Sequence, residues 1–188
     1  MLLRPVCQSY FDAYFKLAFD KRIWQYYPFE ITTIDELQGW LIDCISDRNA
    51  CNRAAFSILD KDSGEIAGSS CYGNISYRDR RLEIGWSWIN PRFQRTGINR
   101  HAKFLLLEYA FEVLGMARVE FKTDVLNEKA RKALLGIGCT EEGVLRSHTL
   151  MPKGRRRDTI FYSLLRDEWP ATKAAVFAGY QSLASENG

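Results

Sequence analysis

The hexapeptide Gln94-Arg95-Thr96-Gly97-Ile98-Asn99 lies between an apolar, strand-like run at residues 82–89 and a long amphipathic helix predicted from about residue 99 to residue 114. A strand that is followed by a tight glycine turn and by the first turn of a helix forms a binding site for an anion. The N–H groups in the first turn of a helix have no intrahelical partner, and the helix macrodipole adds partial positive charge there. The hexapeptide therefore predicts a binding site for a phosphate or pyrophosphate group.

The periodicity after this turn predicts a helix, a strand and a second helix. Apolar residues recur at helical spacing up to a stop at Gly115, namely Ala102, Leu105, Leu106, Tyr109, Ala110 and Val113. Val119 and Phe121 alternate with charged residues in the strand. The second helix begins at Asn127 and ends at Gly138, with an apolar stripe of Ala130, Ala133, Leu134 and Ile137. A strand–helix–strand order of this kind requires a parallel crossover.

The flanks of this centre predict antiparallel pairs. Three strands of a meander are expected at residues 54–60, 65–76 and 82–89. A hairpin is expected near the C-terminus, with arms at residues 140–150 and 157–165 and a turn at Pro152-Lys153-Gly154. Hairpins around a parallel crossover give a mixed sheet, so the predicted fold class is α+β.

Helices are predicted at both ends of the chain. Ser9-Tyr10-Phe11-Asp12 has the pattern of a helix start, and Thr33-Ile34-Asp35-Glu36 is a capping box that opens a second helix to about Asp47. A C-terminal helical tail is expected over about residues 170–185. No repeat or linker divides the sequence, so residues 1–188 are predicted to form a single domain.

Composition limits the classes of function. The net charge of +3 is far below that of a protein whose main partner is a nucleic-acid backbone, and 46% apolar residues suffice for a sizeable core. No run approaches the length of a membrane-spanning helix, and residues 1–5 lack the pattern of a secretory signal. These features favour a cytoplasmic protein without a membrane partner.

The cysteines predict neither disulfides nor a metal site. There are five, at irregular spacing and without a C-x-x-C pair: Cys7, Cys44, Cys51, Cys71 and Cys139. Thiol catalysis would need a nearby base, and neither His101 nor His148 is adjacent to a cysteine in sequence. We expect buried free thiols and no metal.

The spacing of the hexapeptide, Gln/Arg-x-x-Gly-x-Gly/Ala, resembles the pyrophosphate-binding signature of the GNAT superfamily of acetyl-CoA-dependent N-acetyltransferases, with Asn99 departing from the final small residue. The resemblance extends over residues 82–169. It includes Leu82-Glu83-Ile84-Gly85-Trp86, Asp124-Val125-Leu126-Asn127 and Arg157-Asp158, in the order and spacing of the RimJ and RimL ribosomal-protein N-terminal acetyltransferases. It implies a mixed, mostly antiparallel sheet of about seven strands flanked by about four to five helices, with acetyl-CoA as cosubstrate.

Glu83 is the candidate catalytic base. Strict alternation places Glu83, Gly85, Ser87 and Ile89 on one face of the strand, and Leu82, Ile84, Trp86 and Trp88 on the other. A carboxylate suits amine acetylation, because the attacking amine must lose a proton, and GNAT enzymes often carry a basic glutamate on this strand. The competing interpretation is an exposed glutamate paired with Arg81 or a neighbouring strand. A bulge in the strand would change which residues share a face.

The donor site is predicted from the hexapeptide and its surroundings. Backbone amides from Arg95 to Asn99, including those of Thr96 and Ile98, are expected to hold the pyrophosphate, with Gly97 allowing close approach and Arg95 or Arg92 adding charge. Asn99 is expected to add a side-chain cap. The resemblance further implies that main-chain groups of Trp88 and Ile89 bind the pantetheine arm and that Asn127 contacts the cofactor, while asparagine is also a good N-cap.

The acid that protonates the leaving thiolate is unassigned. Many GNAT enzymes place a tyrosine seven residues after the asparagine, but this position is Leu134 here. Tyr162, Ser147 and His148 lie on the final hairpin and are alternatives, although a structural role on a strand suits each of them. A water molecule could also supply the proton, since a free thiol has a pKa of about 8.5.

The predicted reaction is direct acetyl transfer from acetyl-CoA to a primary amine. The acceptor is either a protein N-terminus or a small amine such as a polyamine, an amino acid or an antibiotic, and a non-catalytic acyl-CoA-binding module is a third possibility. The aromatic segment at residues 24–29 is either a core plug or a wall of the acceptor pocket. The basic turn at residues 153–157 is either a solvated loop or a contact for an acidic peptide or ribosomal RNA. Many GNAT proteins are dimers, so the resemblance is compatible with a homodimer.

Overall fold

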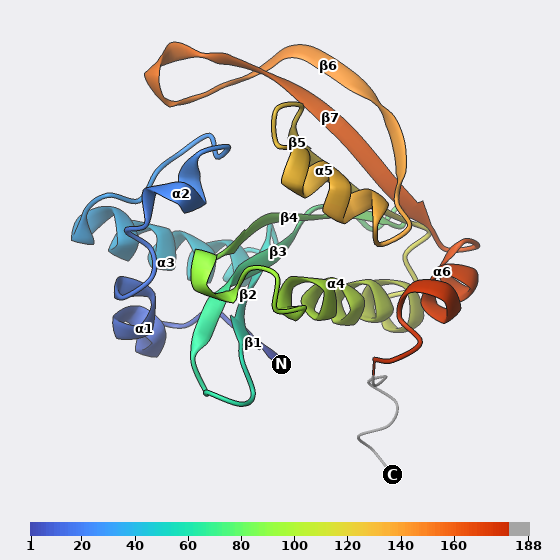
Figure 1. Cartoon of the computed structure of the whole chain (residues 1–188), viewed down its shortest axis with the longest axis horizontal. Helices are drawn as coiled ribbons and strands as arrows, with labels where there is room; N and C mark the ends of the chain where they lie inside the picture. The colour runs from blue at the N-terminus through green and yellow to red at the C-terminus, as the bar shows by residue number, and fades with distance from the viewer. Residues whose placement is uncertain (181–188) are drawn as a thin grey trace.

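The computed structural model describes residues 1–180, which form one seven-stranded sheet with helices on both faces (Figure 1). The strands are β1 (Leu2–Pro5), β2 (Ala54–Leu59), β3 (Ile66–Ser76), β4 (Arg81–Ile89), β5 (Arg118–Asp124), β6 (Thr140–Leu150) and β7 (Arg156–Leu165). The α-helices are α1 (Phe11–Phe15), α2 (Lys21–Trp24), α3 (Ile34–Asn49), α4 (Ile98–Glu108), α5 (Glu128–Leu135) and α6 (Trp169–Val176).

The sheet has the order β1-β2-β3-β4-β5-β7-β6, and each neighbouring pair is antiparallel except β4 and β5. The predicted mixed, mostly antiparallel sheet is confirmed. The parallel pair arises because α4 connects β4 to β5 as a crossover. β1 and α2 were not predicted, because each has only four residues and is too short to show a period.

The helices bury separate cores on the two faces of the sheet. One core joins Leu82 and Ile84 of β4 to α4, α5 and α6. The other joins Trp88 of β4 to α1, α2 and α3 and includes Tyr14 and Trp40. Burial of large aromatic and aliphatic side chains on both faces is the main stabilising contribution. Because β4 contributes side chains to both cores, the position of its backbone is fixed from both sides.

The predicted buried face of α4 is partly wrong. Tyr109 and Val113 are 41% and 60% exposed, whereas Phe104 and Phe111 are buried. The physical reason is α6, which packs on α4 from a second side and brings Phe177 to a ring distance of 5.3 Å from Phe104. The helix also changes to a π-helical turn at Tyr109–Val113 before it ends.

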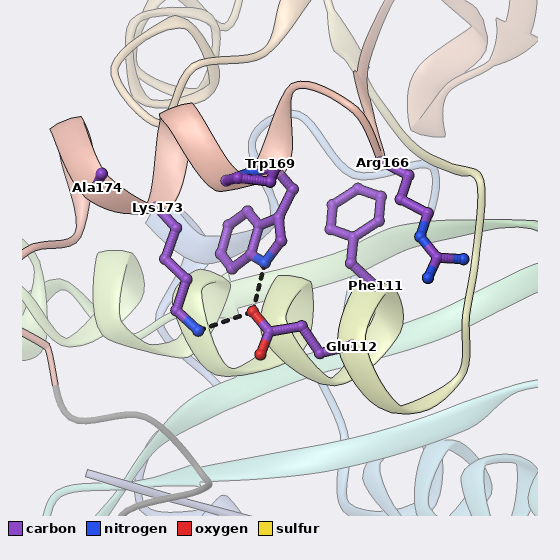
Figure 2. Close-up of a pocket in the computed structure, with 7 residues that line it drawn as sticks. Phe111, Glu112, Arg166, Trp169, Lys173 and Ala174 are labelled. Carbon is purple, nitrogen blue, oxygen red and sulfur yellow. Dashed lines mark hydrogen bonds and ion pairs between the residues drawn. The ribbon is translucent and has the colours of Figure 1, made fainter.

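Side-chain contacts fasten α6 to the end of α4 (Figure 2). Lys173 Nζ donates to Glu112 Oε1 at 2.7 Å, and Trp169 Nε1 donates to the same oxygen at 2.7 Å. A pocket of about 480 Å³ lies between these elements and contains none of the predicted site residues. The short helix expected after Pro170 is present as α6, but it ends at Val176, so residues 177–180 of the predicted tail are not helical. Residues 181–185 of the predicted tail lie outside the described residues.

Helix ends match the predictions unevenly. The capping box of Thr33 and Glu36 is present at α3. At the first predicted helix, the chain forms a 3-10 turn followed by the short helix α1, and Ser9 does not cap it. α5 ends at Leu135 rather than at Gly138, because its last turn tightens and the N–H of Ile137 donates to the carbonyl of Leu134 at 3.2 Å.

All five cysteines are free, but the predicted burial is wrong for two of them, because Cys51 is exposed and Cys7 is half-buried. Burial raises the pKa of the thiols of Cys44, Cys71 and Cys139 to about 12, so these groups are protonated at neutral pH. The described part of the chain contains no helix that combines the length and apolar character needed to cross a membrane.

Candidate active site

β4 and β5 are paired over a short stretch and then separate. Residues 81–83 lie opposite residues 118–120, and no further pair joins these two strands. β4 remains paired with β3 as far as Ile89, and β5 with β7 as far as Asp124. The edge of β4 that faces β5 therefore has no strand partner at residues 84–89. Free N–H and C=O groups on such an edge can hydrogen-bond an extended ligand.

Glu83 lies at the point where the two strands separate. Its side chain is buried, with the residue 4% exposed. Oε2 accepts a hydrogen bond from Asn74 Nδ2 at 2.7 Å and lies 2.9 Å from Lys122 Nζ. The other oxygen, Oε1, lies over Gly85, where an added Cβ would come within 2.6 Å of it. Oε2 is thus anchored by two groups, whereas Oε1 makes no hydrogen bond or ion pair with another residue of the described chain.

The competing interpretation of Glu83 is confirmed in one part, the pairing with a neighbouring strand, and wrong in the exposure and in the pairing with Arg81. Arg81 does not pair with Glu83; its guanidinium lies 3.4 Å from Glu120 Oε2 on β5. The partner on the neighbouring strand is Lys122, and the carboxylate is buried rather than solvated. Burial and fixed contacts hold the carboxylate in one orientation, and its role as a base stays a prediction.

A β-bulge in β4 corrects the predicted alternation. Trp86 and Ser87 together lie opposite Ser70, because the register shifts between the pairs Cys71 with Gly85 and Ser69 with Trp88. Trp86 and Trp88 consequently lie on the same face as Glu83, and Ser87 turns to the face covered by α4. Strict alternation failed because the extra residue reverses the order of faces beyond it.

The hexapeptide forms an exposed turn at the N-terminus of α4. Arg95 and Gly97 adopt positive φ values of 64° and 86°. The N–H of His101 donates to the carbonyl of Gly97, so the N–H groups of Ile98, Asn99 and Arg100 precede the first intrahelical bond. Arg95 has no ion-pair partner within residues 1–180. These features fit an anionic group such as a pyrophosphate.

Two details of the predicted donor site differ in the structure. The N-cap of α4 is Gly97, without a side-chain cap, and Asn99 lies inside the first turn of the helix. The expected cap from Asn99 is therefore absent, because the helix begins one residue earlier than predicted. Arg92 pairs with Glu65, which leaves Arg95 as the cation at the turn.

The remaining predicted donor residues lie along the same end of the sheet. Asn127 caps α5, with Oδ1 accepting the N–H of Ala130 at 3.2 Å. Trp88 is buried against Trp24 at a ring distance of 5.6 Å. The carbonyl of Ile89 accepts a hydrogen bond from Gln94 Nε2 at 3.1 Å, which links the strand end to the turn. Since α4 and α5 follow the C-terminal ends of two parallel strands, both helix N-termini lie at one edge of the sheet.

Each polar candidate for the acid already makes a side-chain hydrogen bond elsewhere in the structure. Leu134 is buried in the core. Tyr162 Oη donates to Glu141 at 3.0 Å and accepts from Arg131. His148 Nδ1 lies 3.1 Å from Thr159 Oγ1, and Ser147 contacts Arg156 within the hairpin. These contacts favour a structural role for Tyr162, Ser147 and His148. The group that protonates the leaving thiolate stays unassigned.

A groove of about 710 Å³ lies between the α2 region and the turn that joins β6 to β7. Figure 1 shows the long β6–β7 hairpin extending beyond the sheet on the side of α2. Trp24 and Tyr27 line the groove, so the aromatic segment contributes both a wall and a plug, because Trp24 also packs on Trp88. The basic side chains Lys21, Arg22, Lys153 and Arg155 outnumber the acidic Glu30 in its lining.

Arg157 on β7 joins the aromatic segment at residues 24–29 to the sheet. The side chain is buried, and its Nη1 donates to the carbonyl of Tyr26 at 3.4 Å. Burial lowers the pKa of the guanidinium, and the nearby carboxylates of Asp124 and Glu83 oppose that effect. From the sequence, Arg157 and Trp86 were named as part of the GNAT resemblance but not as site residues, and Asn74 and Lys122 were not named at all. The contacts of these residues join segments that lie apart in the sequence, so local patterns did not predict them.

The comparisons with known proteins agree with this geometry. Residues 1–140 match the family model described as the acetyltransferase (GNAT) domain, and the chain therefore belongs to the GNAT acetyltransferase family. A relative from Bacillus subtilis (strain 168), "Putative ribosomal N-acetyltransferase YdaF", is 38% identical over 110 residues, which span 58% of this chain and 59% of the relative.

Two solved structures share the fold. RimJ of Mycobacterium smegmatis in complex with CoA-disulfide has a TM-score of 0.82 and 21% identity, with 96% of this chain and 90% of that chain covered. Spermidine N-acetyltransferase of Vibrio cholerae in complex with CoA and spermine has a TM-score of 0.75 and 24% identity, with 90% and 97% covered. The Vibrio cholerae protein is named for a polyamine, whereas the Bacillus subtilis relative is named a putative ribosomal N-acetyltransferase.

Proposed function

We propose that the protein transfers the acetyl group of acetyl-CoA directly to the N-terminal amine of a protein or peptide. The observation that carries the proposal is the gap between β4 and β5, with a buried carboxylate at its closed end and the N-terminus of α4 at the end of β4. In this arrangement the turn at Gly97 would hold the pyrophosphate, and the free edge of β4 would bind the pantetheine arm.

The chain's own groups can supply the steps of the transfer. Glu83 Oε1 would accept a proton from the ammonium form of the acceptor, directly or through a water, and so produce a neutral nucleophile. The amine nitrogen then forms a bond to the acetyl carbonyl carbon, and backbone N–H groups of β4 would stabilise the developing oxyanion. The newly bonded nitrogen gives its second proton to solvent, and Glu83 returns the first proton to solvent. The carbon–sulfur bond breaks, and the thiolate takes up a proton from solvent. Together these steps turn acetyl-CoA and an ammonium group into an amide, CoA and one proton.

We infer a peptide acceptor with acidic residues after the reacting amine, because of the charge of the groove. Arg22 pairs with Asp20, and Arg155 pairs with the buried Asp124, but Lys21 and Lys153 are exposed and have no ion-pair partner within residues 1–180. Two uncompensated ammonium groups favour an anionic peptide and disfavour a polycation such as spermidine.

The acceptor is tested with peptides that share their first two residues and carry either acidic or basic residues after them, beside spermidine and single amino acids. We expect kcat/KM to be higher for the acidic peptide than for the basic one, by about fivefold for each ion pair with Lys21 or Lys153, because such a pair contributes about 1 kcal/mol. The preference should decrease at high salt. Lys153→Glu should reverse the preference, and Lys16→Glu, outside the groove, should not.

Activity on small amines alone would contradict the peptide acceptor. Tight binding of acetyl-CoA without turnover on any amine would instead indicate a non-catalytic acyl-CoA-binding module.

The donor site is tested by ligand-induced stabilisation. Acetyl-CoA at a hundred times its Kd should stabilise the folded protein by about 2.7 kcal/mol and raise Tm by several degrees. Gly97→Glu should abolish the rise, because it places a carboxylate where the pyrophosphate would bind and a side chain at a φ of 86°. Gly115→Glu is the control, since it carries a similar backbone strain at a φ of 65° beyond the opposite end of α4. Equal Tm shifts in both variants would overturn the assignment of the turn.

A further inference from the structure

A lysine is buried beneath the bulge of β4, on the face opposite Glu83. Lys103 projects from α4 and is 6% exposed. Its Nζ lies 2.6 Å from Ser87 Oγ and 3.2 Å from Ser70 Oγ. It also lies 5.7 Å from the centre of the Phe121 ring on β5. The ammonium therefore contacts side chains of β3, β4 and β5, under the place where β4 and β5 separate.

The bulge above this lysine has an unfavourable backbone conformation. Trp86 has a φ of 48°, which is uncommon for a bulky residue. The Trp86 ring packs closely over Gly73, where an added Cβ would come within 2.4 Å of the ring. Ser87 is held from the opposite face by Lys103 and Ser70. Strained residues that the surrounding structure holds in place are concentrated at functional sites.

Within residues 1–180, the hydrogen-bond partners of the ammonium group are the hydroxyls of Ser70 and Ser87, and no ion pair joins it to a carboxylate. Burial lowers the pKa of Lys103 to about 8, and Cys71 on β3, Cys139 after α5 and Glu83 on β4 act in the opposite direction. Both cysteines are protonated at neutral pH, so Glu83 supplies the negative charge among these groups. A buried cation held by serine hydroxyls alone is costly for folding, and a leucine-like side chain would fill an ordinary core position better.

We propose that Lys103 is a positioning residue for acetyl transfer: its ammonium group holds Ser87, and through Ser87 the bulge of β4, in the conformation that the reaction requires. The inference rests on the proposed function, which assigns the acetyl group to the gap beside this bulge. The bulge sets the direction of the backbone N–H groups on the free edge of β4, and oxyanion stabilisation depends on that direction. The positive charge beneath the edge also favours the negative charge that develops during transfer.

The proposal is tested by steady-state kinetics of Lys103→Met and Ser87→Ala, with both substrates varied. Methionine has a similar length and leaves the Ser70–Ser87 hydrogen bond of 2.8 Å in place. We expect each variant to lower kcat by about 10- to 100-fold, the range for a small misplacement of catalytic groups, with KM for acetyl-CoA unchanged. The double variant should be no worse than the poorer single variant, because both remove the same link.

The pH profile separates positioning by the ammonium from a purely structural role. Lys103 is charged below about pH 8, so kcat of the wild type should fall as pH rises through that value, and Lys103→Met should lack this fall. Ser69→Ala is the matched control, since this buried hydroxyl on β3 has no hydrogen-bond partner among the described residues; it should retain the wild-type kcat and the wild-type profile.

A Lys103→Met variant with wild-type kcat and pH profile would overturn this inference and leave the proposed function intact. Failure of the wild type to acetylate any amine would instead overturn the proposed function. The rise of Tm with acetyl-CoA, measured on each variant, verifies that each one is folded and binds the donor.

Discussion

Glu83→Gln is expected to lower kcat by about 10²- to 10⁴-fold, the usual contribution of a general base. The substitution keeps the shape of the side chain. The amide oxygen can still accept the hydrogen bonds of Asn74 and Lys122, and the amide nitrogen then lies over Gly85. Because the amide cannot accept the acceptor's proton, turnover falls while KM for acetyl-CoA stays constant. Initial rates of thiol release at saturating substrates measure the loss.

Two further variants make the test of Glu83 specific. Gly85→Ala keeps the carboxylate but adds a Cβ that would lie 2.6 Å from Oε1, so the carboxylate must move and kcat should fall to an intermediate value. Glu120→Gln is the control, because Glu120 lies opposite Glu83 on β5 but pairs with Arg81 and Arg118. Wild-type turnover in Glu83→Gln, or an equal loss in Glu120→Gln, would contradict the assignment of Glu83 as base.

Lys103→Met is expected to stabilise the folded protein. Burial lowers the pKa of the ammonium from 10.5 to about 8, so at neutral pH the folded state holds a cation at a cost. A difference of one pKa unit corresponds to about 1.36 kcal/mol, so the charged Lys103 lowers the free energy of unfolding by about 3 kcal/mol. Methionine removes the charge and fills a similar volume, so Tm at pH 7 should rise by several degrees.

The pH dependence of this gain has a definite sign. Between about pH 8 and 10.5 the folded wild type has released the proton of Lys103, whereas the unfolded chain still holds it. The unfolded state then binds more protons, so the stability of the wild type rises with pH across this range. The advantage of Lys103→Met should therefore be largest at pH 7 and should shrink as pH approaches 10.5. Thermal unfolding at pH 7 and pH 9.5 measures both values.

Lys16→Met is the control for this measurement, because Lys16 is exposed and its substitution should leave Tm nearly unchanged. A Lys103→Met variant that is less stable than the wild type at pH 7 would mean that the serine contacts of the ammonium outweigh its desolvation. Greater stability together with slower turnover would show a residue kept for activity at the expense of stability.

Much of the fold follows from local patterns in the sequence. Alternation predicts β3 and β4, the capping box predicts the start of α3, and the turn at Gly97 predicts the crossover that makes β4 and β5 parallel. These elements could be predicted because each one carries its own signal within a few residues. Glu83 and Asn127 were predicted as site residues from local patterns together with the GNAT resemblance, and their roles stay predictions.

The rest depends on contacts between distant segments. The bulge at Trp86 is held by packing of the Trp86 ring over Gly73 and by the hydrogen bond of Ser87 with Lys103. The alternation of residues within β4 carries no information about these contacts. The buried face of α4 depends on α6, which lies some 60 residues later in the chain. The contact between Lys173 and Glu112 is an example of this long-range packing. Lys103 gave no signal, because a lysine in an amphipathic helix is expected at the surface.

The gap between β4 and β5 also has a mechanical consequence. The sheet consists of two blocks, β1–β4 and β5–β7–β6, and the backbone ladder between them is limited to residues 81–83 and 118–120. If the two blocks rotate relative to each other, the axis of rotation would lie at this short paired stretch, which includes Glu83, and the gap would widen or narrow. A pantetheine arm bound along residues 84–89 would supply hydrogen bonds to the part of β4 that β5 does not pair with. Binding of the donor would therefore restrict the relative motion of the two blocks and stiffen the whole sheet.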